Sequence, residues 1–290
     1  MTEIELFRHS ALDPTLHVWG WEIAVYLFLG GLAAGAMVLA GAAKSRAARL
    51  LVFVAPLALS LGMLALFLDL ENKLHVFRFY TAWRITSPMS WGAWILLLIY
   101  PATMLYGLAQ FEIAGRFANV IAFARKYEPR LRGINIALGV ALGAYTGILL
   151  ATLTARAAWG SLFLAPLFLA SGVSAAAALA MLLSLSDADR ASFRRWDLVA
   201  IGAEAVLLGV FFLDLIAAGG ARGRAAASLF FGGAYTSVFW SLVVIAGLGV
   251  PLVIELVESR HRIHVALAPA LVLIGGLSLR WIFVLAGQSM

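Results

Sequence analysis

Eight stretches of the sequence are apolar for long enough to cross a lipid bilayer as an α-helix. Crossing about 30 Å of hydrocarbon takes about 20 apolar residues at a rise of about 1.5 Å per residue. The stretches cover residues 19–43, 48–70, 90–109, 133–154, 159–185, 198–216, 235–257 and 265–286. The chain is 63% hydrophobic and 12% charged, whereas soluble domains are about 45–50% apolar and about 25% charged. The sequence therefore predicts an all-α integral membrane protein with about eight transmembrane helices.

Basic residues between the spans predict the orientation of the chain. The loops on one side carry 13 Lys and Arg residues, and the side that holds both termini carries 8. The positive-inside rule then places both termini on the periplasmic, outer side of a prokaryotic cytoplasmic membrane. The net charge of +6 is divided among short clusters between apolar runs, which favours inner loops over a basic face for nucleic acid.

The two halves of the chain resemble each other in sequence. Phe-Leu-Asp-Leu at 67–70 ends the second span and recurs at 212–215, where it ends the sixth, and Leu-Phe-Leu at 27–29 recurs at 167–169. We therefore expect two four-helix units, residues 1–156 and 157–290. An axis along the membrane normal relates the two members of such a parallel internal repeat.

Few ionisable residues lie within the spans, and each is a functional candidate because charge is costly in hydrocarbon. Apart from Arg49, which is counted with the loop that precedes the second span, they are Glu22, Asp69, Glu204, Asp214, Glu255 and Arg280. Helix directions predict that Glu22, Tyr26, Asp69 and Tyr145 converge in the half of the bundle that holds the termini. On the residues alone, the alternative is that Tyr26 and Tyr145 only hydrogen-bond to neighbouring helices.

The residue types exclude several redox groups from this chain. There is no cysteine, so the chain offers no thiolate ligand for an iron–sulfur cluster. The five histidines fall at or beyond the predicted helix ends, which argues against a haem held across the membrane. His261 and His264, beside Arg260 and Arg262, are interpreted as part of a cationic inner loop, and we expect no metal site.

Three stretches resemble the polysulfide reductase membrane-subunit family, often called NrfD/PsrC. They are residues 19–35 (WGWEIAVYLFLGGLAAG), residues 86–94 (TSPMSWGAW), and Tyr145-Thr146-Gly147 followed by Arg156 and Trp159. The second stretch is the most specific, because hydropathy alone does not produce a proline turn that leads into Trp-Gly-x-Trp.

The resemblance implies a quinone-reactive membrane anchor of a multi-subunit respiratory oxidoreductase. Such a subunit exchanges electrons between menaquinone or ubiquinone and a separate four-cluster, ferredoxin-like iron–sulfur subunit, often alongside a molybdopterin catalytic subunit. Tyr145 matches a tyrosine near the quinone of the polysulfide-reductase branch, whereas Tyr26 stands where that branch has a histidine.

The expected site residues fall into three groups. Candidates for quinone binding are Tyr145, Tyr26, Glu22 and His17. Candidates for proton transfer are Glu22, Asp69, Asp214 and Glu204. Candidates for the rim or for partner contact are Arg156, Trp159 and Arg84.

Two other functions remain open from the sequence. The duplicated halves and the carboxyl groups Glu204, Asp214 and Glu255 also suit a proton-translocating or solute-transporting membrane protein. A passive anchor without a quinone site is the third possibility. A cysteine-rich ferredoxin-like protein encoded beside this chain would favour electron transfer.

Overall fold

The chain folds into a helical bundle that crosses the membrane eight times. The computed structural model describes residues 19–43, 45–70, 73–75, 77–81, 87–110, 118–153, 155–184, 186–258 and 266–289. Six of the spans are α2 (Trp21–Ala42), α3 (Arg46–Asp69), α5 (Pro88–Gln110), α7 (Glu128–Ala151), α8 (Leu164–Leu183) and α9 (Asp187–Ala217). The seventh joins α11 (Thr236–Val238), the π-helical η3 (Phe239–Gly249) and α12 (Val250–Glu258), and the eighth is α13 (Leu267–Gln288).

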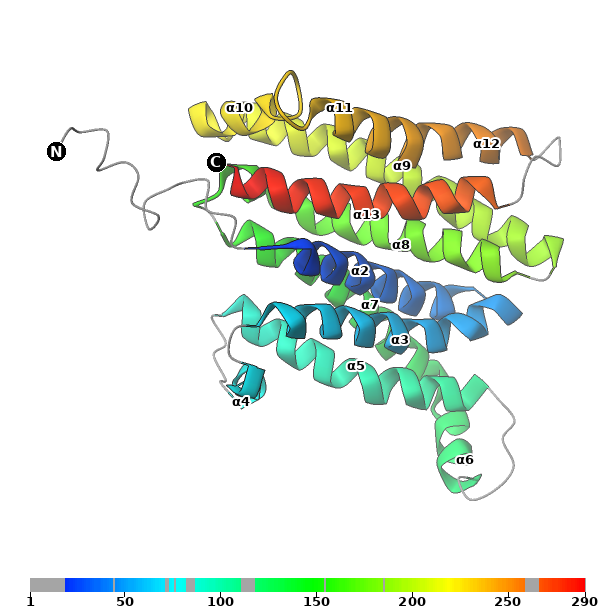
Figure 1. The fold of residues 1–290 in the computed structure, drawn as a ribbon. Coiled ribbons are helices and arrows are strands. Elements are labelled where there is room, and N and C mark those ends of the chain that lie inside the picture. Colours follow the sequence, from blue (N-terminus) through cyan, green and yellow to red (C-terminus); the bar gives the residue numbers. More distant parts are fainter. Residues whose placement is uncertain are drawn as a thin grey trace, which may run out of the picture.

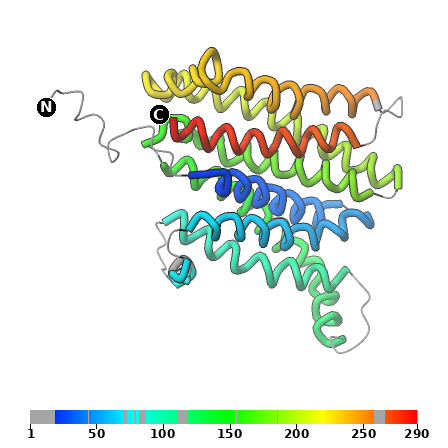
Figure 2. The backbone as a smooth tube through the Cα atoms, viewed as in Figure 1, coloured from blue at the N-terminus to red at the C-terminus, as the bar shows by residue number. Residues whose placement is uncertain are grey.

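The spans lie side by side and run nearly parallel (Figure 1). Residues at both ends of the described chain meet at one end of the bundle, where the Trp19 N–H donates to Gln288 Oε1 at 2.7 Å. We call this the terminal end and the opposite one the distal end (Figure 2). Short helices in the described connections between the spans are η1 (Lys73–His75), α4 (Arg78–Thr81), α6 (Ala118–Lys126), η2 (Ala157–Trp159) and α10 (Gly220–Ser228).

The eight predicted spans are confirmed, but three of the predicted starts are wrong by five residues or more. The fourth span begins at Glu128 and not at residue 133. The fifth span begins at Leu164 and not at residue 159, because residues 157–159 form a separate 3-10 turn. The sixth begins at Asp187 and not at residue 198. Here the Ser186 hydroxyl accepts from the Asp189 N–H at 3.2 Å, and such a cap starts a helix in polar sequence that hydropathy does not detect.

Helix α2 lies at the centre of the bundle and packs against α3, α7, α8 and α13. Glycine allows α2 to approach α8 closely, since a Cβ on Gly35 of α2 would overlap the backbone of Gly172 on α8. Small residues drive such contacts in membranes, where burial of apolar surface gives no net gain over contact with lipid. Large apolar side chains face outward instead, as with Leu57, Val199 and Val206, which are 63%, 70% and 67% exposed.

Candidate functional site

A cavity of about 660 Å³ opens near the terminal end of the first four spans. Its volume lies in the range of about 300–1,000 Å³ that is typical of small-molecule sites. Residues from α2, α3, α4, α5 and α7 line it, together with Trp19 and Leu70. The wall consists of Trp19, Ile23, Tyr26, Leu27, Ser60, Met63, Leu64, Leu66, Phe67, Asp69, Leu70, Tyr80, Met89, Gly92, Ala93, Leu96, Tyr145, Leu149 and Leu150.

Two tyrosine hydroxyls in this wall are available to a ligand. Tyr26 and Tyr145 are 4% and 5% exposed, yet neither hydroxyl hydrogen-bonds to any residue in the described part of the chain. Buried tyrosine hydroxyls normally find a partner. The two side chains lie close enough to interact electrostatically, so a ligand between them has two donors within reach.

Gly92 explains the Trp-Gly-x-Trp stretch that opens α5. A Cβ on Gly92 would overlap the ring and hydroxyl of Tyr145, so only glycine leaves room for that side chain. Helix α5 begins with Pro88 at the terminal end, so Gly92 lies about one turn inside the bundle. Tyr145 lies at a similar depth, because it comes six residues before the terminal end of α7. The motif therefore positions a side chain of another helix.

Polar groups gather at the end of the cavity that faces the terminal end. Asp69 is the last residue of α3, and Tyr80 comes from the short α4. Tyr80 interacts electrostatically with Tyr26. Partial burial and the nearby Tyr100 phenol raise the pKa of Tyr80, so its hydroxyl stays protonated at neutral pH and can donate a hydrogen bond.

The cavity also reaches the outer surface of the bundle. Leu64 and Met89 line it, and their side chains are 53% and 52% exposed. In a membrane that surface meets lipid tails, so an apolar ligand can enter sideways from the bilayer. A lipid-soluble molecule with polar oxygens on a ring matches a cavity that is apolar at its mouth and carries two hydroxyls inside.

The structure brings only part of the predicted site together. Tyr26, Tyr145 and Asp69 share the cavity. Glu22 lies one turn from Tyr26 but outside the cavity wall, with its carboxyl against Gly20. His17 and Arg84 lie outside the described residues. Sequence reasoning missed Tyr80, whose short helix interrupts a polar loop and gives no periodic signal.

Two of the three residues predicted for the rim, Arg156 and Trp159, bind within the chain. Arg156 Nη1 donates to the Gln288 carbonyl at 3.1 Å. Trp159 is 3% exposed, donates from Nε1 to the Phe283 carbonyl at 2.8 Å, and stacks on Trp19 with ring centroids 5.1 Å apart. These contacts join the start of α2 to the end of α13.

The two acidic residues of the second half that were predicted for proton transfer lie away from the cavity. Asp214 is half-buried near the terminal end of α9. Glu204 is buried beside Arg280 and Ser171. A second buried carboxyl on α9, Asp197, was not predicted because the apolar stretch used to predict this helix starts one residue after it.

Comparison with known proteins finds relatives along nearly the whole chain. The family model described as "Polysulphide reductase, NrfD" matches residues 10–290. The C subunit of polysulfide reductase from Wolinella succinogenes is 29% identical over 94% of this chain and 95% of its own length. Protein NrfD from Escherichia coli is 31% identical over 99% of both proteins, and the NrfD homolog of Haemophilus influenzae is 28% identical over 93% of this chain and 94% of its own length. The chain therefore belongs to the NrfD/PsrC family of polysulfide reductase membrane subunits.

Proposed function

We propose that this protein is the quinone-reactive membrane subunit of a respiratory oxidoreductase, and that it passes electrons between the quinone pool and a separate iron–sulfur subunit. One observation carries the proposal: two buried tyrosines, whose hydroxyls have no hydrogen-bond partner among the described residues, line a cavity that reaches the lipid-facing surface. Menaquinone and ubiquinone both carry two ring oxygens and an apolar tail, so the cavity suits either.

The wall residues take distinct roles in this proposal. A quinone, when bound, supplies the two-electron, two-proton chemistry. Tyr145 and Tyr26 donate hydrogen bonds to its two oxygens and so fix the orientation of the ring. Asp69, at the polar end of the cavity, exchanges protons with water, which is the task of a general acid or base near the reacting oxygen.

We propose that Glu22 and His17 belong to the rim of the quinone cavity. Glu22 lies one turn from Tyr26 toward the terminal end, where it can exchange protons with Asp69 through solvent. Glu204 and Asp214 remain proposed proton-transfer groups of the second half.

The electron partner is expected at the terminal end. The chain has no cysteine, so a cluster ligated by cysteine thiolates has to be held by another polypeptide. Similarity to the C subunit of polysulfide reductase implies a multi-subunit complex, in which we propose a four-cluster iron–sulfur subunit and a molybdopterin catalytic subunit. Arg156, which donates to the Gln288 carbonyl at the terminal end, and Arg84 are proposed to border that partner. Trp159 is proposed to stabilise the same rim from inside.

Orientation and internal symmetry belong to the same proposal. The excess of Lys and Arg in the distal loops supports a cytoplasmic distal end and a periplasmic terminal end. Four spans fall in residues 1–156 and four in 157–290, which supports two units related by a parallel repeat.

Purification of the complex in mild detergent tests the proposal. We expect the preparation to contain bound quinone and iron–sulfur clusters in a second subunit, as read by extraction and by electron paramagnetic resonance. An intact complex that lacks any iron–sulfur subunit would rule out the electron-transfer role, whatever the topology.

A further inference from the structure

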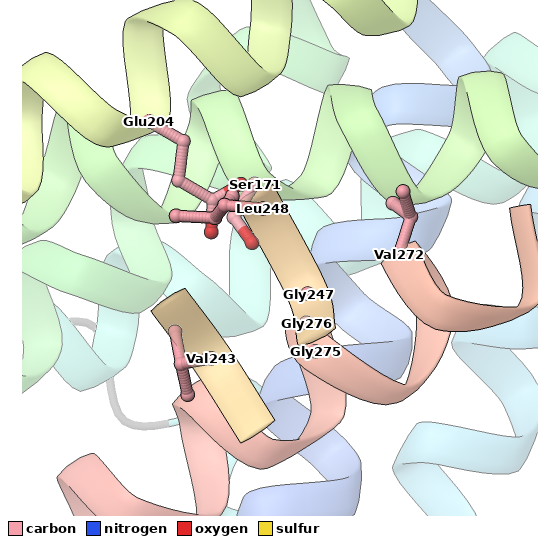
Figure 3. Close-up of a pocket in the computed structure, with 8 residues that line it drawn as sticks. All are labelled: Ser171, Glu204, Val243, Gly247, Leu248, Val272, Gly275 and Gly276. Carbon is pink, nitrogen blue, oxygen red and sulfur yellow. The ribbon is translucent and has the colours of Figure 1, made fainter. Parts of the chain in front are cut away.

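A further cavity, of about 680 Å³, lies at the distal end of the bundle, on the opposite side from the quinone cavity. The end of α2, the end of α5 and the starts of α3, α7 and α9 line this distal cavity. It differs from the crevice beside Glu204 in the second half, which has no room for a water-sized sphere (Figure 3). The charged residues in the wall of the distal cavity are Arg46, Arg49, Glu128, Arg132 and Asp189.

The guanidinium groups in this wall are available to a ligand. Within the described part of the chain, no hydrogen bond or ion pair forms at the side chains of Arg46, Arg49 or Arg132. Three guanidinium groups and two carboxylates leave an excess of one positive charge in the wall. Helices α3, α7 and α9 also begin at this end, and the positive ends of their dipoles add to that excess. The distal cavity is therefore complementary to an anion.

The distal cavity lies at the depth of lipid headgroups. Helix α2 has 22 residues and is about 33 Å long at about 1.5 Å per residue, which is close to the roughly 30 Å of hydrocarbon. Gly41, in the last turn of α2, lines the cavity, so the cavity meets the boundary between the hydrocarbon and the headgroups. The anionic group present throughout that layer is the phosphate of a phospholipid.

One face of α3 leads from the distal cavity toward the lipid tails. Arg46 and Arg49, both exposed, stand three residues apart at its start. Phe53 and Leu57 follow at steps of four residues and so lie on the same face, where they are 54% and 63% exposed. A phospholipid matches this face, since its phosphate meets the arginines and an acyl chain meets the apolar side chains. Free phosphate would use only the first part.

The acidic residues of the wall suit a headgroup that carries hydroxyls. The carboxylates of Glu128 and Asp189 can only accept hydrogen bonds, and the two glycerol hydroxyls of phosphatidylglycerol donate them. The Tyr106 hydroxyl is already used, because it donates to the Ala40 carbonyl at 3.0 Å. Phosphatidylethanolamine has no net charge and leaves the excess positive charge of the wall without a counter-charge. Phosphatidylglycerol supplies both the negative charge and the hydroxyl donors.

We propose that the distal cavity binds the headgroup of phosphatidylglycerol from the distal leaflet. Arg46, Arg49 and Arg132 donate charge-assisted hydrogen bonds to its phosphate. Glu128 and Asp189 accept hydrogen bonds from its glycerol hydroxyls. The bound lipid connects the helix ends around the cavity, and because it binds only the folded bundle it stabilises that bundle.

Lipid titration of the purified complex tests the site without quinone turnover. The complex is stripped of lipid in a neutral detergent, and native mass spectrometry measures the Kd of each added lipid. We expect phosphatidylglycerol to bind about 5-fold more tightly than phosphatidylethanolamine, the effect of one additional attracted charge. Arg49→Gln should raise the Kd of phosphatidylglycerol by about 10-fold or more through loss of a charge-assisted hydrogen bond.

Arg195→Gln is the matched control. Arg195 is an exposed arginine in the distal part of α9 that lies outside the cavity wall, so the same loss of charge should leave the Kd unchanged. Arg46→Gln is a second cavity variant at an exposed position, and it should weaken binding as Arg49→Gln does if the latter misfolds. An equal rise in Kd for the control and the cavity variants would overturn the site.

Inorganic phosphate separates the lipid from the free anion. Phosphatidylglycerol should raise the midpoint of thermal unfolding of the wild type more than that of Arg49→Gln, and an equal concentration of inorganic phosphate should raise neither. An equal rise with inorganic phosphate would overturn the assignment to a lipid. Equal affinity for phosphatidylethanolamine would overturn the selection of an anionic headgroup. None of these readouts uses quinone, so a failure of the proposed function would leave them unchanged.

Discussion

Substitution of Tyr145 by phenylalanine tests whether the Tyr145 hydroxyl binds a ligand or stabilises the fold. The Tyr145 hydroxyl has no hydrogen-bond partner in the described part of the chain, so its removal costs no intramolecular bond. We expect Tyr145→Phe to change the free energy of unfolding by less than about 0.5 kcal/mol. It should weaken quinone binding by about 1–2 kcal/mol, the cost of leaving a buried acceptor without its donor.

That energy corresponds to a roughly 5- to 30-fold rise in the Kd of a quinone analogue. Titration of the purified complex with the analogue, followed by calorimetry, measures the Kd, and the midpoint of thermal unfolding reports stability. Tyr145→Phe with an unchanged Kd, or with a large loss of stability, would refute the assigned role.

Tyr106→Phe is the matched control for this experiment. Tyr106 is also a buried tyrosine, with an exposed fraction of 3%, but it lies toward the distal end of α5 and its hydroxyl donates to the Ala40 carbonyl at 3.0 Å. Its loss should lower stability by about 0.5–1.5 kcal/mol and leave the Kd unchanged. The two variants should thus show opposite patterns in the two assays.

Two glycine substitutions test the close contacts of the bundle. Gly92→Ala should push the Tyr145 ring into the cavity and lower the free energy of unfolding by about 1–3 kcal/mol through overpacking. It should also raise the Kd of the quinone analogue in the same titration. An unchanged Kd would contradict the role given to this glycine. Gly35→Ala should force α2 and α8 apart at Gly172 and lower the unfolding midpoint, whereas Gly202→Ala, where no described atom lies within 4 Å of the added Cβ, should leave it unchanged or raise it. Equal midpoints for these last two variants would argue against tight packing of α2 on α8.

The spans were predicted well because the mean hydropathy of a segment depends only on its own consecutive residues. It failed at the start of α9, where a hydrogen-bonded cap at Ser186 extends the helix through charged turns. That error hid Asp197, which looked like a loop residue and is fully buried. Side-chain burial depends on which helices pack together, and no local pattern reports it.

The candidate site was predicted in part for a similar reason. Helix direction and depth were enough to place Tyr26, Tyr145 and Asp69 at one level, and all three line the cavity. The same argument included Glu22, which lies at the right height but outside the wall. Tyr80 was missed because it reaches the cavity from a four-residue helix in a loop, and so short a helix shows no sequence periodicity.

Photoaffinity labelling tests most directly whether a quinone occupies the cavity. The purified complex is irradiated with a quinone analogue that carries a photoreactive group, and mass spectrometry then identifies the labelled residues. We predict labels on the cavity-lining parts of α2, α3, α5 and α7, such as those around Tyr26, Met63, Met89 and Tyr145, and competition by excess unlabelled quinone. Labelling confined to other faces of the bundle, or labelling that quinone does not displace, would contradict the central claim.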